Sequence, residues 1–453
     1  MKMFLKNNYV YLILYIFILF SLLVSYNMFF GDSIVNYGFS YAISRGEVPY
    51  LDFNLVVPLF SPWFYAIFLI FSKSSLWYFS VQALLVVLLF KLLYSLIKEK
   101  SYLLLPILFL GFPISLVTII FPGYNFILMC LIFLLIYLEK NKKSDYIIGF
   151  ILGLMILTKH TIGIFYILPS LFFVRDFKRL GKRLLGLLVP VFVFVIYLLC
   201  TGSFYSFINL CVLGLFDFAS SNSNVFSYWL LVPLFLAIIY YIYAIKKNPK
   251  DIVLYYSLLS ILYIIPLFDS YHLSFFLFFT FFFILYRSKF TCEHIFRYVF
   301  VFLVFEASLW TYITLSFQGG SYQFQSYPNY PLRYFSKKDV YNYQEVMDYV
   351  EKTSYDVVFF GLGTENYFYK ITNNLDITYF DLPNYGNYGY HGYQMMVERF
   401  EELDSDTVIL VDTSVLYGKK NKNQQYFREL ASYVVQNYEY LGDVSKYGVY
   451  LKK

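Results

Sequence analysis

The sequence has few charged residues and few cysteines, and both shortages limit what the protein can be. Only 14% of its 453 residues are charged, whereas soluble domains carry about 25%. This composition excludes an ordinary soluble protein. The four cysteines are scattered in or beside apolar segments, at Cys130, Cys200, Cys211 and Cys292. No disulfide or metal framework is visible in that spacing, and the redox compartment is not indicated.

Hydrophobic residues are abundant instead and make up 59% of the chain. The first long apolar run, 9–30, follows Lys2 and Lys6 and is too long, and too aromatic near its end, for a cleavable signal peptide. It predicts a retained span with a cytoplasmic N-terminus. The chain as a whole is predicted to be a polytopic α-helical protein of the bacterial plasma membrane.

Basic residues gather in short loops, as is typical of cytoplasmic loops. The clusters lie near 98–100, 140–143, 175–183, 246–250 and 287–297. Placing them inside predicts about eleven spans, near residues 9–30, 75–97, 101–119, 124–138, 146–157, 162–174, 184–200, 227–245, 251–267, 273–286 and 296–317. This arrangement leaves the C-terminus outside and residues 31–74 as the first outer loop.

Two apolar segments do not fit a simple span. Pro58 to Phe71 would cover only about 21 Å as a helix, against a hydrocarbon core of about 30 Å, and is predicted to lie in the outer leaflet. The run 147–174 is interrupted by Lys159 and His160 and is flanked on both sides by basic clusters. We therefore predict a hairpin with Lys159 and His160 at its outer tip. The alternative is one tilted span with a buried lysine, which places a costly charge within the membrane.

Beyond residue 317 the composition is that of a soluble domain. Residues 318–453 hold 17 of the 29 acidic residues and 13 of the 35 basic residues. Periodicity predicts a linker at 322–334, helices at 339–352, 391–403 and 423–437, strands at 356–361 and 407–412, and a hairpin at 438–451. The chain is thus predicted to divide into a membrane domain, 1–317, and a small extracytoplasmic α/β domain, 318–453, with a partly parallel sheet. The Gly361-Leu362-Gly363-Thr364 stretch lacks the full dinucleotide fingerprint.

The same charge rule places a set of polar residues on the outer face of the membrane. They are Asp32, Arg45, Asp52, Lys73, Asn125, Lys159, His160, Asp217, Asp269 and His272. A carboxylate can take the proton of a hydroxyl group, and cations can stabilise a departing phosphate. Transfer of a sugar from a polyprenyl phosphate needs both, because the phosphate gains negative charge as its bond to the sugar breaks.

The stretch from Asp32 to Leu59 resembles the C-type superfamily of integral membrane glycosyltransferases (GT-C). The resemblance lies in Asp32 at the end of the first span, in the Gly46-x-x-Pro49-Tyr50-x-Asp52-Phe53 segment and in Pro58-Leu59. Protein O-mannosyltransferases and aminoarabinose lipid A transferases belong to this superfamily. Many members have paired acidic residues where Asp32 stands between Gly31 and Ser33, and this departure puts a bound divalent metal in doubt.

The resemblance implies an inverting glycosyltransferase with a polyprenyl-phosphate-linked sugar as donor. The acceptor would be a cell-wall polymer, a glycolipid or a protein of the cell envelope, and membrane lipids rather than nucleic acid would be the other partners. Asp32 and Asp52 are the expected catalytic carboxylates, with Asp32 as base. Lys159, His160 and Arg45 are expected at the donor phosphate, and Asp269, His272 and Asp217 are expected to orient the sugar or the acceptor.

Purely structural roles are the alternative for several of these residues. Asp32 would then cap a helix from 33 to 44 that ends before Gly46, and Asp52 would stabilise its own loop. Lys159 and His160 would bind ordinary lipid phosphates, and Arg45 would pair with Glu47 or extend to the lipid headgroups.

Two other classes of protein compete with the transferase. A transporter or flippase of lipid-linked sugars needs polar residues open to both faces and often has repeated halves, whereas the polar residues here share one face and no repeat is visible. A non-catalytic scaffold would need only the outer domain. Glu306, inside the last predicted span, is either functional or paired within the bundle.

Overall fold

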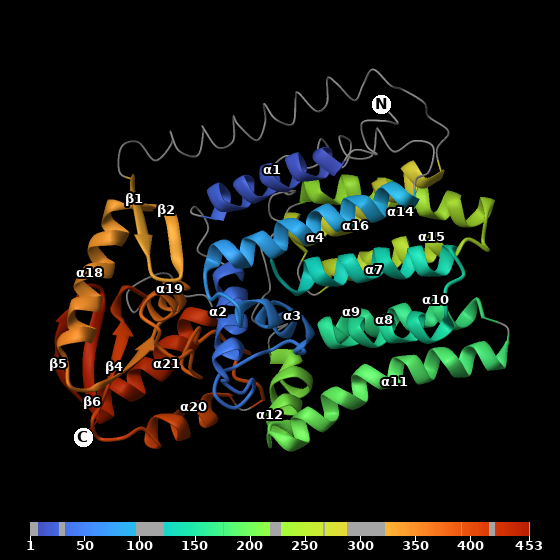
Figure 1. Ribbon diagram of the computed structural model, residues 1–453. Coiled ribbons are helices and arrows are strands. Elements are labelled where there is room, and N and C mark those ends of the chain that lie inside the picture. The colour runs from blue at the N-terminus through green and yellow to red at the C-terminus, as the bar shows by residue number, and fades with distance from the viewer. Residues whose placement is uncertain are drawn as a thin grey trace.

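The molecule has a helical bundle at one end and a domain with a small mixed sheet at the other, with α2 (Asp32–Arg45) standing between them (Figure 1). The computed structural model describes residues 8–26, 32–96, 122–174, 176–217, 228–265, 268–287, 322–390, 392–415 and 422–452. Within these ranges the predicted combination of a helical protein and a small, partly parallel sheet is confirmed.

The bundle is built from helices that are mostly apolar on several faces. Its members are α1 (Asn8–Tyr26), α3 (Phe60–Leu69), α4 (Ser75–Leu96), α7 (Tyr124–Lys140), α8 (Asp145–Thr158), α9 (His160–Gly163), α10 (Ile167–Phe172), α11 (Phe177–Cys200), α12 (Phe204–Ile208), α14 (Leu231–Lys247), α15 (Ile252–Leu259) and α16 (Ser270–Arg287). A π-helical turn, η2 (Asn209–Leu213), follows α12.

Only part of the predicted set of spans is matched by long apolar helices. Two helical segments among the described residues are long and apolar enough to cross a membrane, Ser75–Leu93 and Phe177–Cys200. Others are shorter, such as α8 with 14 residues, because turns and breaks interrupt the apolar runs. The predicted spans 101–119 and 296–317, with Glu306, lie outside the described residues. The count of about eleven spans is therefore not confirmed.

The second domain begins with a hairpin where the sequence predicted a linker. Strands β1 (Tyr322–Tyr327) and β2 (Tyr330–Ser336) pair antiparallel, so the linker at 322–334 is wrong. Asn329 adopts φ 59° at the turn, a conformation that asparagine tolerates better than most residues.

The remaining elements of this domain follow the predicted order. They are α18 (Lys337–Lys352), β3 (Asp356–Phe360), α19 (Glu365–Thr372), α20 (Gly392–Glu401), β4 (Thr407–Asp412), α21 (Lys422–Asn437), β5 (Tyr438–Val444) and β6 (Tyr447–Lys452). The sheet order is β3-β4-β6-β5, with β3 and β4 parallel and the other pairs antiparallel. Every residue of β4 is buried, as expected of a central strand covered on both faces.

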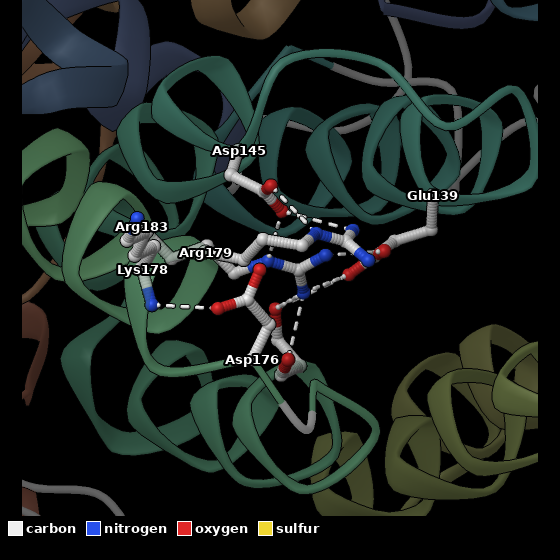
Figure 2. A network of polar contacts seen from close by, with 7 residues as sticks. Glu139, Asp145, Asp176, Lys178, Arg179 and Arg183 are labelled. Carbon is white, nitrogen blue, oxygen red and sulfur yellow. Dashed lines mark hydrogen bonds and ion pairs between the residues drawn. The ribbon is translucent and has the colours of Figure 1, made fainter.

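A buried arginine ties five helices together at one end of the bundle. Arg183 in α11 is 1% exposed, and its guanidinium donates to Glu139 of α7 at 2.5 and 2.8 Å and to Asp145 of α8 at 2.8 Å. It also donates to the carbonyl oxygen of Ser170 in α10 at 2.7 Å, and Tyr256 of α15 donates to Glu139 at 3.1 Å. Figure 2 shows the two carboxylates converging on the guanidinium. Each charge is paired, which is the condition under which buried charges persist.

This network corrects the prediction that residues 175–183 form a basic loop before a span at 184–200. The helix α11 begins at Phe177, where Asp176 caps it by accepting a hydrogen bond from the backbone N–H of Lys178. The charge rule counts basic residues without regard to their ion-pair partners. It therefore could not distinguish the buried Arg183 from the exposed basic residues beside it.

Helices α8 and α11 run side by side in the same direction and touch through glycines. A Cβ atom on Gly149 would lie 1.9 Å from a carbonyl oxygen of α11, and one on Gly153 would lie 2.6 Å from another. A Cβ atom on Gly186 of α11 would lie 2.1 Å from a carbonyl oxygen of α8. Only glycine fits at these contacts. Gly149 and Gly153 are four residues apart, the spacing by which small residues bring helices close together in membranes.

Replacing Arg183 by glutamine should lower the free energy of unfolding by about 3–5 kcal/mol, because Glu139 and Asp145 would keep their charges without this partner. Arg179→Gln is the matched control. Arg179 also contacts Asp145, at 2.9 Å, but it is 47% exposed, so its loss should cost at most about 1 kcal/mol. Denaturant unfolding of the purified proteins in detergent measures both values, and equal losses would contradict the structural role of Arg183.

Replacing Gly149 by alanine should destabilise the protein by about 1–3 kcal/mol or more, because the new methyl group would overlap the backbone of α11. Gly181→Ala in α11 is the control, since a Cβ atom there meets no other atom within 4 Å. That change should be neutral or should stabilise the helix by up to about 1 kcal/mol. Thermal unfolding of the two variants compares them; similar melting temperatures would show that α8 and α11 are not in close contact.

Candidate functional site

The chain reverses direction at Lys159, at the end of the bundle opposite the Arg183 network. The backbone of Lys159, which lies between α8 and α9, is extended, with φ −154° and ψ 90°. Past the turn, a Cβ atom on Gly163 would lie 2.4 Å from the carbonyl oxygen of Met155 in α8, while Ser170 in α10 is back beside Arg183. The predicted hairpin is confirmed and the single tilted span is wrong, while the outer location of the hairpin tip stays a prediction.

The Lys159 ammonium is held by an amide and by aromatic rings. Its Nζ atom donates to Oδ1 of Asn125 at 3.0 Å and lies 5.2 and 5.8 Å from the ring centroids of Tyr124 and Tyr263. The Tyr263 hydroxyl donates to the Asn125 carbonyl oxygen at 3.2 Å. Lys159 lies in the turn between the two helical arms, and burial there lowers its pKa to about 8, against the opposing effect of the Asp269 carboxylate. The ammonium is a partly desolvated cation with N–H groups to spare for an anion.

Asp269 and His272 form a second part of the same site. The Asp269 carboxylate accepts hydrogen bonds from the backbone N–H of His272 at 2.8 Å and from its ring Nδ1 at 2.9 Å. Burial acts to raise the pKa of Asp269, but these hydrogen bonds hold it below its ordinary value. With Nδ1 engaged by a carboxylate, the Nε2 atom of His272 is the nitrogen left for a proton or a substrate oxygen.

One tyrosine connects the two parts of the site. The Tyr271 hydroxyl accepts a hydrogen bond from the Asn125 side chain at 3.5 Å, and its ring packs edge-on against His272 at 5.0 Å. Asn125 is therefore the central residue of the site. The sequence placed it on the outer face but gave it no role, and it missed Tyr124, Tyr263 and Tyr271, because tyrosines are common throughout this chain.

His160 points to a different environment from Lys159, although the two are neighbours. Its ring nitrogens are buried, and among the described residues the backbone of Cys211 lies near them without a hydrogen bond of normal geometry. Burial, reinforced by the charge of Lys159, lowers the pKa of His160, and the backbone of Cys211 in η2 acts in the opposite sense. Burial thus favours the neutral imidazole of His160 at neutral pH, and its place at the donor phosphate stays a prediction.

Asp32 is the first residue of α2, and its side chain lies outside what the structure describes. The helix itself matches the predicted one and ends at Arg45, just before Gly46, which has φ 99°. One turn into α2, the side-chain amide of Asn36 lies 3.3 Å from where a Cβ atom on Gly123 would be. The first turn of α2 thus contacts the segment that leads into Tyr124 and Asn125 at Asn36, and a role of Asp32 in the Lys159 site stays a prediction.

Arg45 and Asp217 join the bundle side of the molecule to the second domain. Arg45 donates to Asp376 at 2.5 Å and to the carbonyl oxygen of Asn374 at 2.6 Å, and lies 3.6 Å from Glu47. The structural alternative for Arg45, in which it pairs with Glu47, is therefore seen in the structure. Asp217 accepts a hydrogen bond from the Tyr385 hydroxyl at 3.2 Å.

Asp52 closes its own turn by accepting the backbone N–H of Val48 at 2.6 Å. The neighbouring Tyr50 is fully buried with φ 71°, and its carbonyl oxygen accepts a hydrogen bond from Tyr379 at 3.2 Å. The segment that carries the family resemblance thus holds the second domain against α2. Among the described residues, no hydrogen bond or ion pair joins Asp52 or Arg45 to the Lys159 site.

Metal binding has no visible ligand set here. Across the part of the chain that the structure describes, no three or more His, Cys, Asp or Glu side chains gather in an arrangement that could hold a metal ion.

Binding of an anionic lipid phosphate at Lys159 should weaken as the pH rises from about 7 to about 9, because the ammonium is protonated below its pKa of about 8 and neutral above it. A polyprenyl phosphodiester, which does not titrate in this range, is a suitable ligand for equilibrium binding to purified protein. Lys159→Arg should flatten the profile, since guanidinium stays charged. A profile with the same slope in both proteins would assign the titration to another group.

Protein families and curated proteins supply no relative from which a function can be taken. No protein-family model and no curated protein matches this chain. Its function is therefore inferred from the site geometry and the chemistry of its residues.

Proposed function

We propose that the chain is a polytopic membrane protein of the bacterial plasma membrane, with its N-terminus in the cytoplasm and its second domain outside. Large apolar side chains exposed on the bundle surface in α11 and in α14 support this proposal. In α11 and α14 they include Leu185, Leu188, Val189, Phe192, Val193, Val232, Phe235, Leu236 and Ile239. An apolar surface of this kind, with glycine-mediated helix contacts beneath it, suits a lipid environment.

Within that membrane protein, we infer an inverting glycosyltransferase that moves a sugar from a polyprenyl-phosphate carrier to an acceptor of the cell envelope. The observation that carries the inference is the site at the hairpin tip. A lysine ammonium held by Asn125 and flanked by tyrosines lies there, near a carboxylate–imidazole pair. A transferred phosphate group needs a fixed cation, and a scaffold would have no reason to bury one.

The proposed reaction is a single displacement at the anomeric carbon. The acceptor oxygen forms a bond to that carbon as the bond from the carbon to the phosphate oxygen breaks, and the acceptor proton passes to the Asp32 carboxylate. Lys159 stabilises the negative charge that accumulates on the phosphate. His272, oriented by Asp269, is placed to hydrogen bond the sugar or the phosphate through Nε2. His160 contributes as a neutral group, while Arg45, Asp52 and Asp217 support the fold around the site.

Asp32→Asn should lower the rate of sugar transfer by about 10²-fold or more, because the acceptor hydroxyl would lose its base. Lys159→Gln should lower it by about 10²–10³-fold, because the departing phosphate would lose its cation. The measurement is sugar release from a panel of synthetic polyprenyl-phosphate donors by purified protein with cell-envelope acceptors, with and without a chelator.

Lys73→Gln is the matched control for these variants. Its ammonium also lies near a tyrosine, 6.0 Å from the Tyr41 ring centroid. Lys73 belongs to the same predicted outer loop as Asp32, residues 31–74, but is not part of the Lys159 site. Transfer should stay near the wild-type rate. Full activity in Asp32→Asn would overturn the mechanism, and donor binding without any sugar release by the wild-type protein would favour a flippase or a scaffold.

A further inference from the structure

An apolar groove runs between α8 and α11 on the surface of the bundle, near the Arg183 network. It has a volume of about 390 Å³ and is lined by Tyr146, Ile147, Phe150, Leu185, Gly186 and Val189. At Gly186 the two helices are in close contact, since a Cβ atom there would lie 2.1 Å from the carbonyl oxygen of Tyr146, so backbone forms the floor of the groove. Its walls are open: Leu185 is 57% exposed and Val189 is 52% exposed.

Cations lie beside one end of this groove. The Lys182 ammonium is 5.9 Å from the ring centroid of Tyr146, a residue of the groove wall. Lys178 is one helical turn earlier in α11, and both lysines are exposed. No ion pair between either lysine and a carboxylate is present among the described residues.

The two arginines of the same helix turn have partners already. Arg183 is neutralised mainly by Glu139, and Arg179 by Asp145. Asp176 caps the start of the helix by accepting the Lys178 backbone N–H, as Figure 2 shows. The charge of Lys182 therefore remains available to bind an anion at one end of the apolar groove.

We propose that this groove binds an acyl chain of an anionic phospholipid, with the lipid phosphate against Lys182 and Lys178. The proposal rests on the membrane location in the proposed function, but not on sugar transfer. In a bilayer an acyl chain gains little by leaving other acyl chains for a groove. The preference must therefore come from the headgroup, and basic side chains at the cytoplasmic ends of spans attract anionic lipids. Lys182 lies at the end of α11 that the charge rule assigns to the cytoplasm.

The test compares the binding of phosphatidylglycerol and phosphatidylcholine to purified full-length protein, by native mass spectrometry with lipid added to a detergent solution. Lys182→Gln should weaken phosphatidylglycerol binding about fivefold, the effect of one basic residue near a lipid surface, and should leave phosphatidylcholine binding unchanged. Lys247→Gln is the matched control. Lys247 also lies over a tyrosine, 5.7 Å from the Tyr243 ring centroid at the end of α14, but it does not border this groove.

A second variant, Val189→Trp, tests the apolar part of the site. Val189 is exposed, so the larger ring can fill the groove without entering the core, and it should reduce retained phosphatidylglycerol while unfolding stays unchanged. The proposal is overturned if Lys182→Gln and Lys247→Gln behave alike, if the two phospholipids bind equally, or if a polyprenyl phosphate displaces phosphatidylglycerol. Sugar transfer measured on the same proteins separates the two proposals. If the wild-type protein prefers phosphatidylglycerol but transfers no sugar, the lipid site stands and the proposed transferase function fails.

Discussion

The contact between Arg183 and its carboxylates fixes the hairpin whose tip carries the candidate site. Arg183 holds the start of α8 through Asp145 and the end of α10 through Ser170. The two arms also touch where Gly163 meets Met155. Because both ends of the hairpin are held at the base, the position of Lys159 follows from the packing of the arms. A buried ion pair contributes little net stability compared with apolar packing, but here it determines which helices are neighbours.

The second domain completes this arrangement rather than standing apart from it. Its segment around Asp376 and Tyr379 contacts Arg45 and the backbone of Tyr50. That segment is itself stiffened by a buried pair, Lys370 and Asp381, 2.6 Å apart. The segment from Arg45 to Tyr50 is therefore held by the sheet domain as well as by α2.

The sequence was most informative where local chemistry decides the structure. The helix that ends before Gly46, the hairpin around Lys159 and the parallel strands β3 and β4 follow from glycine conformation, charge in apolar runs and buried β-branched residues. The hairpin β1–β2 was missed because Pro328 and Asn329 resemble linker residues, although they form its turn. The bond between Lys159 and Asn125 joins residues 34 positions apart, and no local pattern encodes such a contact. The partners of Arg183 were hidden for the same reason.

The Arg183 network also has a consequence for the order in which the chain is made. Asp145 and Glu139 precede Arg183 by 38 and 44 residues, so during synthesis both carboxylates emerge well before the cation that neutralises them. Until α11 follows, α7 and α8 carry negative charges that cannot be buried without cost. Both carboxylates can be buried as paired anions only after α11 has been made, so the final packing of α7 and α8 depends on this later helix.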